Sequence, residues 1–184
     1  MAEAAVETEC MTFQGRIYYD FSSSVWRFYR FLTAASNDGV ELRLEWCPFL
    51  AEGDPQSAAG LALVEAVRRR FPERHGAYLQ ALLALRHLED ADLTDPNVTA
   101  MAATSAGIDN TIVPDVEAVA DSTNEGARLG VSDVPAIFRH GPALHVDVNP
   151  AAYSGDIVER LRLIDGVLED DGIWRLSKPQ GYRR

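Results

Sequence analysis

Two kinds of periodicity alternate between residues 16 and 47, and this alternation limits the fold more than any other feature of the sequence. Residues 16–21, RIYYDF, are rich in β-branched and aromatic side chains and predict a strand. Residues 24–34 carry apolar side chains one helical turn apart and predict an amphipathic helix. Residues 40–47, VELRLEWC, alternate apolar and polar side chains and predict a second strand, which Pro48 ends. This order predicts two parallel strands joined by a right-handed crossover.

The middle of the chain predicts helices alone. Helical patterns run from about residue 56 to residue 107, with a break near Pro72, and the next helix is expected at 116–129. Thr94 or Asp95 is expected to cap one of these helices, with Pro96 at its first position.

Two short strands and a helix are expected after this block. Residues 136–138 and 143–146 predict a hairpin, residues 154–168 a helix, and residues 173–176 a short edge segment. The whole order predicts one α/β domain at 15–176 with an all-helical insertion at about 56–115. Residues 1–14 are expected to be disordered, and residues 177–184 to form a tail.

Composition excludes several classes of function. A formal net charge of −11 disfavours nucleic acid as a partner, and the basic cluster Arg68–Arg70 is expected on a solvated helix face. No apolar run reaches the roughly 20 residues that span a bilayer, so no membrane partner is expected. The first ten residues are acidic and lack the features of a signal peptide, which predicts a cytoplasmic protein. The cysteine and histidine spacings favour neither a metal site nor a permanently bound cofactor.

The two cysteines are expected to lie far apart. Cys10 precedes the first strand, whereas Cys47 ends the second. In a parallel pair these points are at opposite ends, roughly 20 Å apart. A disulfide needs Cα atoms within about 7 Å, so a Cys10–Cys47 bond is not expected. Cys47 is instead expected at the same sheet edge as the serines Ser22–Ser24.

Three stretches of the chain resemble the DsbA-like group of thioredoxin-fold proteins. YYDFSSSVW (residues 18–26) resembles the first strand and the active-site turn, and GVSDVPAIF (130–138) resembles the segment that carries a cis-proline loop. CPFL (47–50) is similar to a Pro-Phe segment of two serine-type enzyme classes, kappa-class glutathione transferases and 2-hydroxychromene-2-carboxylate isomerases. The resemblance covers residues 16–168 and implies a thioredoxin-like fold with a helical insertion.

The resemblance also assigns positions within the site. Ser23 stands where redox members keep the nucleophilic cysteine and serine-type members keep a serine, and Trp26 stands at the second cysteine position. Ser24 follows where serine-type members have proline, which departs from their pattern. Val134-Pro135 matches the cis-proline pair. Ser23 and Trp26 cannot exchange disulfides, so a Cys-x-x-Cys oxidoreductase is excluded unless Cys47 acts alone.

Two functions follow from these assignments. In the first, Ser23 is catalytic and activates a small thiol, with glutathione or mycothiol as co-substrate of a transferase or isomerase. The ligand would then contact Ser22, Ser24, Trp26, Cys47, Phe49, Val134 and Pro135. In the second, the protein is a non-catalytic domain that binds a protein partner through the Pro135 loop. The serine-type relatives commonly form dimers, so the resemblance also implies a homodimer.

A plainer interpretation stands beside both. Serines between a strand and a helix are ordinary N-caps. Trp26 lies at helical spacing and is expected more often in a core than in a ligand wall.

Overall fold

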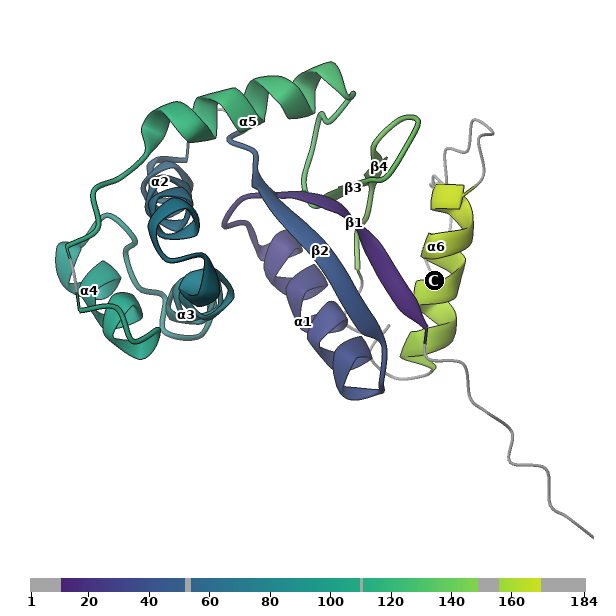
Figure 1. Ribbon diagram of the computed structural model, residues 1–184, viewed down its shortest axis with the longest axis horizontal. Coiled ribbons are helices and arrows are strands. Elements are labelled where there is room, and N and C mark those ends of the chain that lie inside the picture. The colour runs from purple at the N-terminus through teal and green to yellow at the C-terminus, as the bar shows by residue number, and fades with distance from the viewer. Residues whose placement is uncertain (1–10, 52–53, 110, 149–155, 170–184) are drawn as a thin grey trace, which may run out of the picture.

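A mixed sheet with helices on both faces forms one half of the molecule, and a helical block forms the other (Figure 1). The structure, a computed structural model, describes residues 11–51, 54–109, 111–148 and 156–169. The elements are, in order, β1 (Thr12–Tyr19), α1 (Ser23–Asn37), β2 (Glu41–Pro48), α2 (Pro55–Arg70), the 3-10 helix η1 (Pro72–Arg74), α3 (His75–Leu88), α4 (Pro96–Ser105), α5 (Val116–Arg128), β3 (Ala136–Phe138), β4 (Leu144–His145) and α6 (Ile157–Glu169).

The four strands lie in the order β2-β1-β3-β4. β1 and β2 are parallel with Tyr18 opposite Cys47, as the strand–helix–strand pattern predicts. β3 runs antiparallel to β1 with Ala136 opposite Tyr18, and β4 continues the hairpin. The carboxyl ends of β1 and β2 and the start of β3 therefore meet at one edge of the sheet.

Helices cover the two faces of the sheet unequally. The rings of Tyr29 on α1 and Trp46 on β2 lie 5.8 Å apart, and Trp46 pairs with Ile17. Helix α1 therefore covers the face of the sheet that carries Ile17 and Tyr19. α6 lies on the same face, where Arg139 contacts both Phe13 and Asp165. α5 covers the opposite face, the one that carries Tyr18. Alternation along β1 thus separates two layers with different neighbours.

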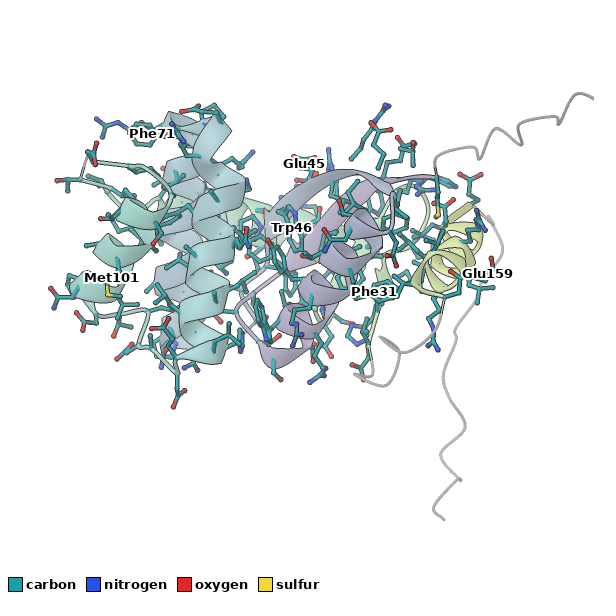
Figure 2. All side chains as sticks on the ribbon, turned by 90° about the horizontal axis from the view of Figure 1, so that it is seen from below. Phe31, Glu45, Trp46, Phe71, Met101 and Glu159 are labelled. Carbon is teal, nitrogen blue, oxygen red and sulfur yellow. The ribbon has the colours of Figure 1, made fainter. Side chains whose placement is uncertain are left out.

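The helical block of α2, α3 and α4 lies beside β2, and α4 is on its far side from the sheet (Figure 1). Met101 of α4 and Glu159 of α6 consequently lie toward opposite ends of the molecule (Figure 2). The break near Pro72 is confirmed, since η1 separates α2 from α3. Asp95 caps α4 by accepting a hydrogen bond from the Asn97 N–H (2.8 Å).

Some of the strand boundaries predicted from the sequence are wrong. β1 begins at Thr12 and not at residue 16, so residues 12–14 pair with β2 and do not belong to a disordered segment. Gly15 weakens the strand pattern here, yet a Cβ atom at this position would lie 3.1 Å from the Phe138 carbonyl oxygen. β4 is shorter than the expected 143–146. Cys10, residues 154–155, the edge segment at 173–176 and the tail at 177–184 lie outside the described residues.

Candidate functional site

The three serines open helix α1, and each has a different environment. Ser22 is the N-cap, with an extended backbone (φ −73°, ψ 160°), and its hydroxyl accepts a hydrogen bond from the Val25 N–H at 3.5 Å. The Ser24 hydroxyl accepts a hydrogen bond from Arg27 (3.1 Å). Ser23 is the first helical residue and is exposed. Only Ser23 therefore presents its hydroxyl to solvent without serving the helix itself.

The helix N-terminus beside Ser23 offers further hydrogen-bond donors. Within the described residues, the backbone N–H groups of Ser23 and Ser24 have no hydrogen-bond partner. Such groups carry the positive end of the helix dipole and favour a negatively charged ligand atom. Arg27 adds a positive charge one turn into the helix, although it also contacts Asp147 (3.3 Å) and the Val148 carbonyl (3.1 Å).

The loop before β3 approaches the same sheet edge. The peptide bond between Val134 and Pro135 is cis, and both residues are buried. Because Ala136 pairs with Tyr18, the antiparallel register places Pro135 beside Tyr19, close to the start of the serine turn. The Pro135 carbonyl accepts a hydrogen bond from the Val146 N–H (2.9 Å). The Val134 N–H donates to the side chain of Asp133 (2.8 Å), which occupies that donor.

A carboxylate occupies the turn between β1 and α1. Asp20 Oδ1 accepts a hydrogen bond from the Ser22 N–H (2.7 Å). Burial raises the pKa of Asp20 above its usual range, and the negative charges of Asp54 and Asp133 act in the same direction. Hydrogen bonds from Ser22 oppose this shift of the pKa without cancelling it. The positive end of α1 is thus surrounded by acidic groups.

The helical insertion holds this turn through the backbone of Phe21. The Phe21 N–H donates to the Ser57 hydroxyl (3.1 Å), which in turn donates to Asp54 Oδ2 (2.6 Å). Ser57 is buried near the start of α2. His87, near the end of α3, lies close to the Phe21 backbone, and burial lowers its pKa. Two helices of the insertion therefore lie against one residue of the turn.

Trp26 lies in a stack of three rings. Its ring is 5.6 Å from His87 at an interplanar angle of 13°, and 6.1 Å from Tyr29 at 7°. His87 was not among the candidates from the sequence. A lone histidine near the end of an apolar helix carries no local signal, because its neighbours come from distant segments.

Cys47 and Phe49 face away from Trp26, toward α5. Phe49 packs edge-on against Tyr18, and a Cβ atom on Gly126 of α5 would lie 2.9 Å from both rings. Cys47 shares this face because it pairs with Tyr18. Burial raises the pKa of its thiol to about 12, so a thiolate is scarce near neutral pH. This argues against the exception in which Cys47 acts alone.

The cavities and clusters of the described residues bear on other ligand sites. Grooves of about 500, 490, 460 and 390 Å³ lie among α1–α5 and β2, and none of these four includes Ser23 or Pro135 in its lining. In the described part of the chain, no three or more His, Cys, Asp or Glu side chains gather as metal ligands would. No helix there is both long and apolar enough to cross a membrane.

Comparison with known proteins shows similarity in structure and none in sequence. The chain matches no known family, and no curated protein is similar to it. A periplasmic thioredoxin-like protein from Salmonella enterica serovar Typhimurium superposes with a TM-score of 0.61 at 13% identity, over 80% of this chain and 83% of its own. The fold is thioredoxin-like.

Other thioredoxin-like neighbours have a similar coverage. ScsC from Proteus mirabilis superposes with a TM-score of 0.61 at 17% identity, over 81% of this chain and 82% of its own. The cytosolic disulfide reductase DsbM from Pseudomonas aeruginosa, solved with GSH, gives 0.59 at 14%, over 85% and 99%. The expected fold class is thereby confirmed. At identities this low, the superpositions establish a thioredoxin-like fold, and the activities of these neighbours do not carry over to this chain.

Proposed function

We propose that the protein binds a small thiol or a similar small ligand where Ser23 and the Val134-Pro135 peptide meet. One observation carries the proposal: an exposed serine, with two unpartnered N–H groups beside it in the described structure, opens α1 at the sheet edge to which the register brings Pro135. A thiolate at this position would gain hydrogen bonds from the serine and from the helix N-terminus.

The energetics of such binding are sufficient to activate a thiol. A hydrogen bond to a charged group contributes about 1.5–3 kcal/mol, which would lower the pKa of a bound thiol by about one to two pH units. Glutathione or mycothiol would then be the co-substrate of a serine-type transferase or isomerase. In support, the Pseudomonas aeruginosa neighbour was solved with GSH. Trp26 would report binding because it lies one turn from Ser23.

A second candidate is a non-catalytic domain that binds a protein partner through the Pro135 loop. The carboxylates of Asp20, Asp54 and Asp133 favour it, because they lie close enough to one another to raise the pKa of Asp20 and would repel a thiolate. Ser24, where serine-type enzymes have proline, favours it as well.

The proposal includes a location and an assembly. We place the protein in the cytoplasm, and the neighbours supply precedents in both compartments, since one is periplasmic and another cytosolic. We further propose that the protein forms a homodimer, which analytical ultracentrifugation would test directly by measuring its mass in solution.

The deciding experiment is a titration of the purified protein with glutathione and with mycothiol. Tryptophan fluorescence and melting temperature are followed for the wild type and for Ser23→Ala. Ser36→Ala is the matched control, because Ser36 is an exposed serine in the last turn of the same helix. Saturable binding that Ser23→Ala weakens and Ser36→Ala leaves intact is the expected result. No response to either thiol would reject the thiol-dependent function and leave the binding domain.

A further inference from the structure

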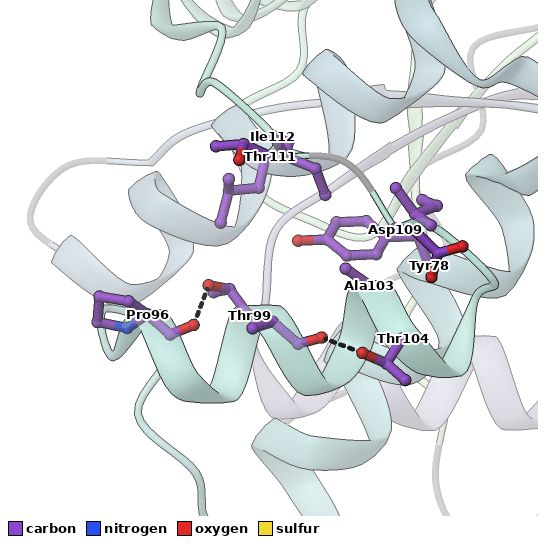
Figure 3. A pocket seen from close by; sticks show the side chains of 11 residues that line it. Tyr78, Pro96, Thr99, Ala103, Thr104, Asp109, Thr111 and Ile112 are labelled. Atoms are coloured by element: carbon purple, nitrogen blue, oxygen red, sulfur yellow. Dashed lines mark hydrogen bonds between the residues drawn. The ribbon is translucent and has the colours of Figure 1, made fainter.

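A pocket of about 500 Å³ lies within the helical insertion, between α3, α4 and the residues 108–109 and 111–112 (Figure 3). This volume falls in the range of about 300–1,000 Å³ that is typical of small-molecule sites. α4 is on the far side of the insertion from the sheet, so the pocket is separate from the Ser23 site (Figures 1 and 2).

The pocket contains a buried polar group without a partner. Tyr78 of α3 is 0% exposed, and its hydroxyl has no hydrogen-bond partner among the described residues. Figure 3 shows the ring with its hydroxyl directed between α4 and the segment of Thr111 and Ile112. Buried hydroxyl groups are nearly always hydrogen-bonded in folded proteins. A ligand in this pocket would supply the missing partner.

Most of the other polar side chains of the pocket are acceptors, and the exception is the Thr111 hydroxyl, which can donate or accept. The Thr99 hydroxyl donates to the Pro96 carbonyl (3.1 Å), and the Thr104 hydroxyl donates to the Ala100 carbonyl (3.0 Å). Their hydrogens are therefore occupied, and their oxygens can only accept. The Asp109 carboxylate, also in the lining, is an acceptor and carries a negative charge.

The other lining side chains are apolar. Leu63, Ala103, Ile108 and Ile112 come from α2, α4 and the segment that follows α4. Arg70 donates to the Thr111 carbonyl (3.4 Å), but its side chain lines the neighbouring groove and not this pocket. The pocket thus combines an apolar wall with several acceptors, a tyrosine hydroxyl and one negative charge.

We propose that this pocket binds a small amine with an apolar or aromatic body. The ammonium group would donate hydrogen bonds to Asp109 and to the threonine oxygens, and its body would lie against the apolar wall. The Tyr78 hydroxyl would hydrogen-bond a polar substituent of the ligand. A ligand with a carboxylate in place of the amine would meet the acceptors and the negative charge of Asp109, and the neutral hydroxyls of Tyr78 and Thr111 would not compensate for that repulsion.

The test uses three probes of similar shape, each with a ring hydroxyl that can pair with Tyr78: 4-(2-aminoethyl)phenol, 4-(2-hydroxyethyl)phenol and 3-(4-hydroxyphenyl)propionate. Binding to the full chain is measured by calorimetry and by chemical shifts of the pocket residues. We expect saturable binding of the amine, weaker binding of the alcohol and none of the carboxylate. Asp109→Asn should reduce the affinity for the amine by about fivefold, near the upper limit for an exposed ion pair, and leave the alcohol unchanged.

Two alanines provide a matched pair of variants. Ala100 is exposed on α4 and lines this pocket, whereas Ala120 is exposed on α5 and lines a groove of about 460 Å³ between α2 and α5. Ala100→Met should abolish binding of the amine, and Ala120→Met should not affect it. The proposal is wrong if no probe saturates, if the carboxylate binds as tightly as the amine, or if Ala100→Met binds like the wild type.

Discussion

The consecutive serines at the start of α1 show how strongly position decides the role of a residue. Ser22 caps the helix, Ser24 accepts a hydrogen bond from Arg27, and Ser23 makes neither contact. The three are identical in sequence, and the backbone alone separates them. The resemblance to serine-type enzymes selected Ser23, and Ser23 is the serine left free for a ligand by the capping pattern.

Replacement of Ser22 by alanine should destabilise the protein, and replacement of Ser23 should not. Loss of an N-cap hydroxyl costs about 1 kcal/mol, whereas alanine is a good helix former at the exposed first position of α1. Urea unfolding followed by circular dichroism measures both. Equal losses for the two variants would show that Ser23 shares the capping role.

The pH dependence of stability should reveal the environment of Asp20. Its pKa is raised above the ordinary 3.8, so folding favours the protonated carboxyl. The associated stability is fully present below the unfolded pKa and is lost as the pH rises through the folded pKa. Asp20→Asn keeps an oxygen to accept the Ser22 N–H, so this variant should exceed the wild type in stability at pH 7.

Unfolding of both proteins between pH 3 and pH 8 checks this expectation. The advantage of Asp20→Asn should shrink as the pH falls toward 3.8 and below. A wild type that gains stability over the variant with rising pH would mean that the helix N-terminus stabilises the Asp20 carboxylate.

At the scale of elements, sequence periodicity predicted most of the helices and strands. α1, β2 and α4 were recognised because each carries its own signal, such as the Asp95 cap and Pro96 of α4. The start of β1 was missed because Gly15 interrupts the run of β-branched and aromatic residues, although Phe13 before it is fully buried. Local sequence patterns show which side chains are apolar, and they do not detect the end of a strand that is stabilised mainly by pairing with the neighbouring strand.

Close packing of α5 on the sheet depends on Gly126. A Cβ atom there would lie 2.9 Å from ring atoms of Tyr18 and Phe49, both buried. Gly126→Ala should therefore reduce the unfolding free energy by about 1–3 kcal/mol, as overpacking does. Gly166→Ala is the control, because among the described residues nothing outside the local backbone of its own helix lies within 4 Å of the added Cβ. That variant should gain up to about 1 kcal/mol from helix propensity.

Thermal unfolding of the two glycine variants gives the comparison. Opposite signs support the close contact between α5 and the sheet. A gain in both would mean that the Tyr18 and Phe49 rings move aside without cost.

At the scale of the whole molecule, a buried charge lies where the insertion meets the sheet. Glu65 of α2 is 0% exposed. Burial raises the pKa of Tyr19 of β1, and the nearby charge of Glu65 acts in the same direction. Arg68 binds the Glu65 carboxylate through two nitrogens, at 2.6 and 2.8 Å. Arg68 was expected on a solvated face, and its side chain is in fact 43% exposed, but its partner is buried.

Arg68→Gln should lower stability far more than Arg69→Gln. The first variant leaves a buried carboxylate unpaired, which costs about 3 kcal/mol. The second breaks the pair of Arg69 with Asp115 (2.7 Å), in which the arginine side chain is 64% exposed, and should cost less than about 1 kcal/mol. Urea unfolding measures both variants, and equal losses would contradict a special role for Glu65.

The candidate site could be predicted only in part from the sequence. Ser23 and Pro135 were found because short motifs mark them, and the cis peptide bond is present as the resemblance implied. Ser57 and His87 were missed because their contacts with Phe21 depend on the path of two helices through space. Cys47 and Phe49 were expected to contact the same ligand as Ser23, Phe49 as a wall of the pocket beside Trp26, whereas strand alternation turns both toward α5.

The contacts of the helical insertion with the turn at Phe21 limit how this chain could be shortened or redesigned. An all-helical insertion looks like a removable module, and the sheet would remain continuous if residues 55–115 were replaced by a short linker. Such a chain would lose Ser57, which accepts the hydrogen bond of the Phe21 N–H, and His87, whose ring stacks on Trp26. The turn that carries Ser23 is thus built on the insertion as much as on the strand before it, and grafting this turn onto a minimal scaffold would require both helices to travel with it.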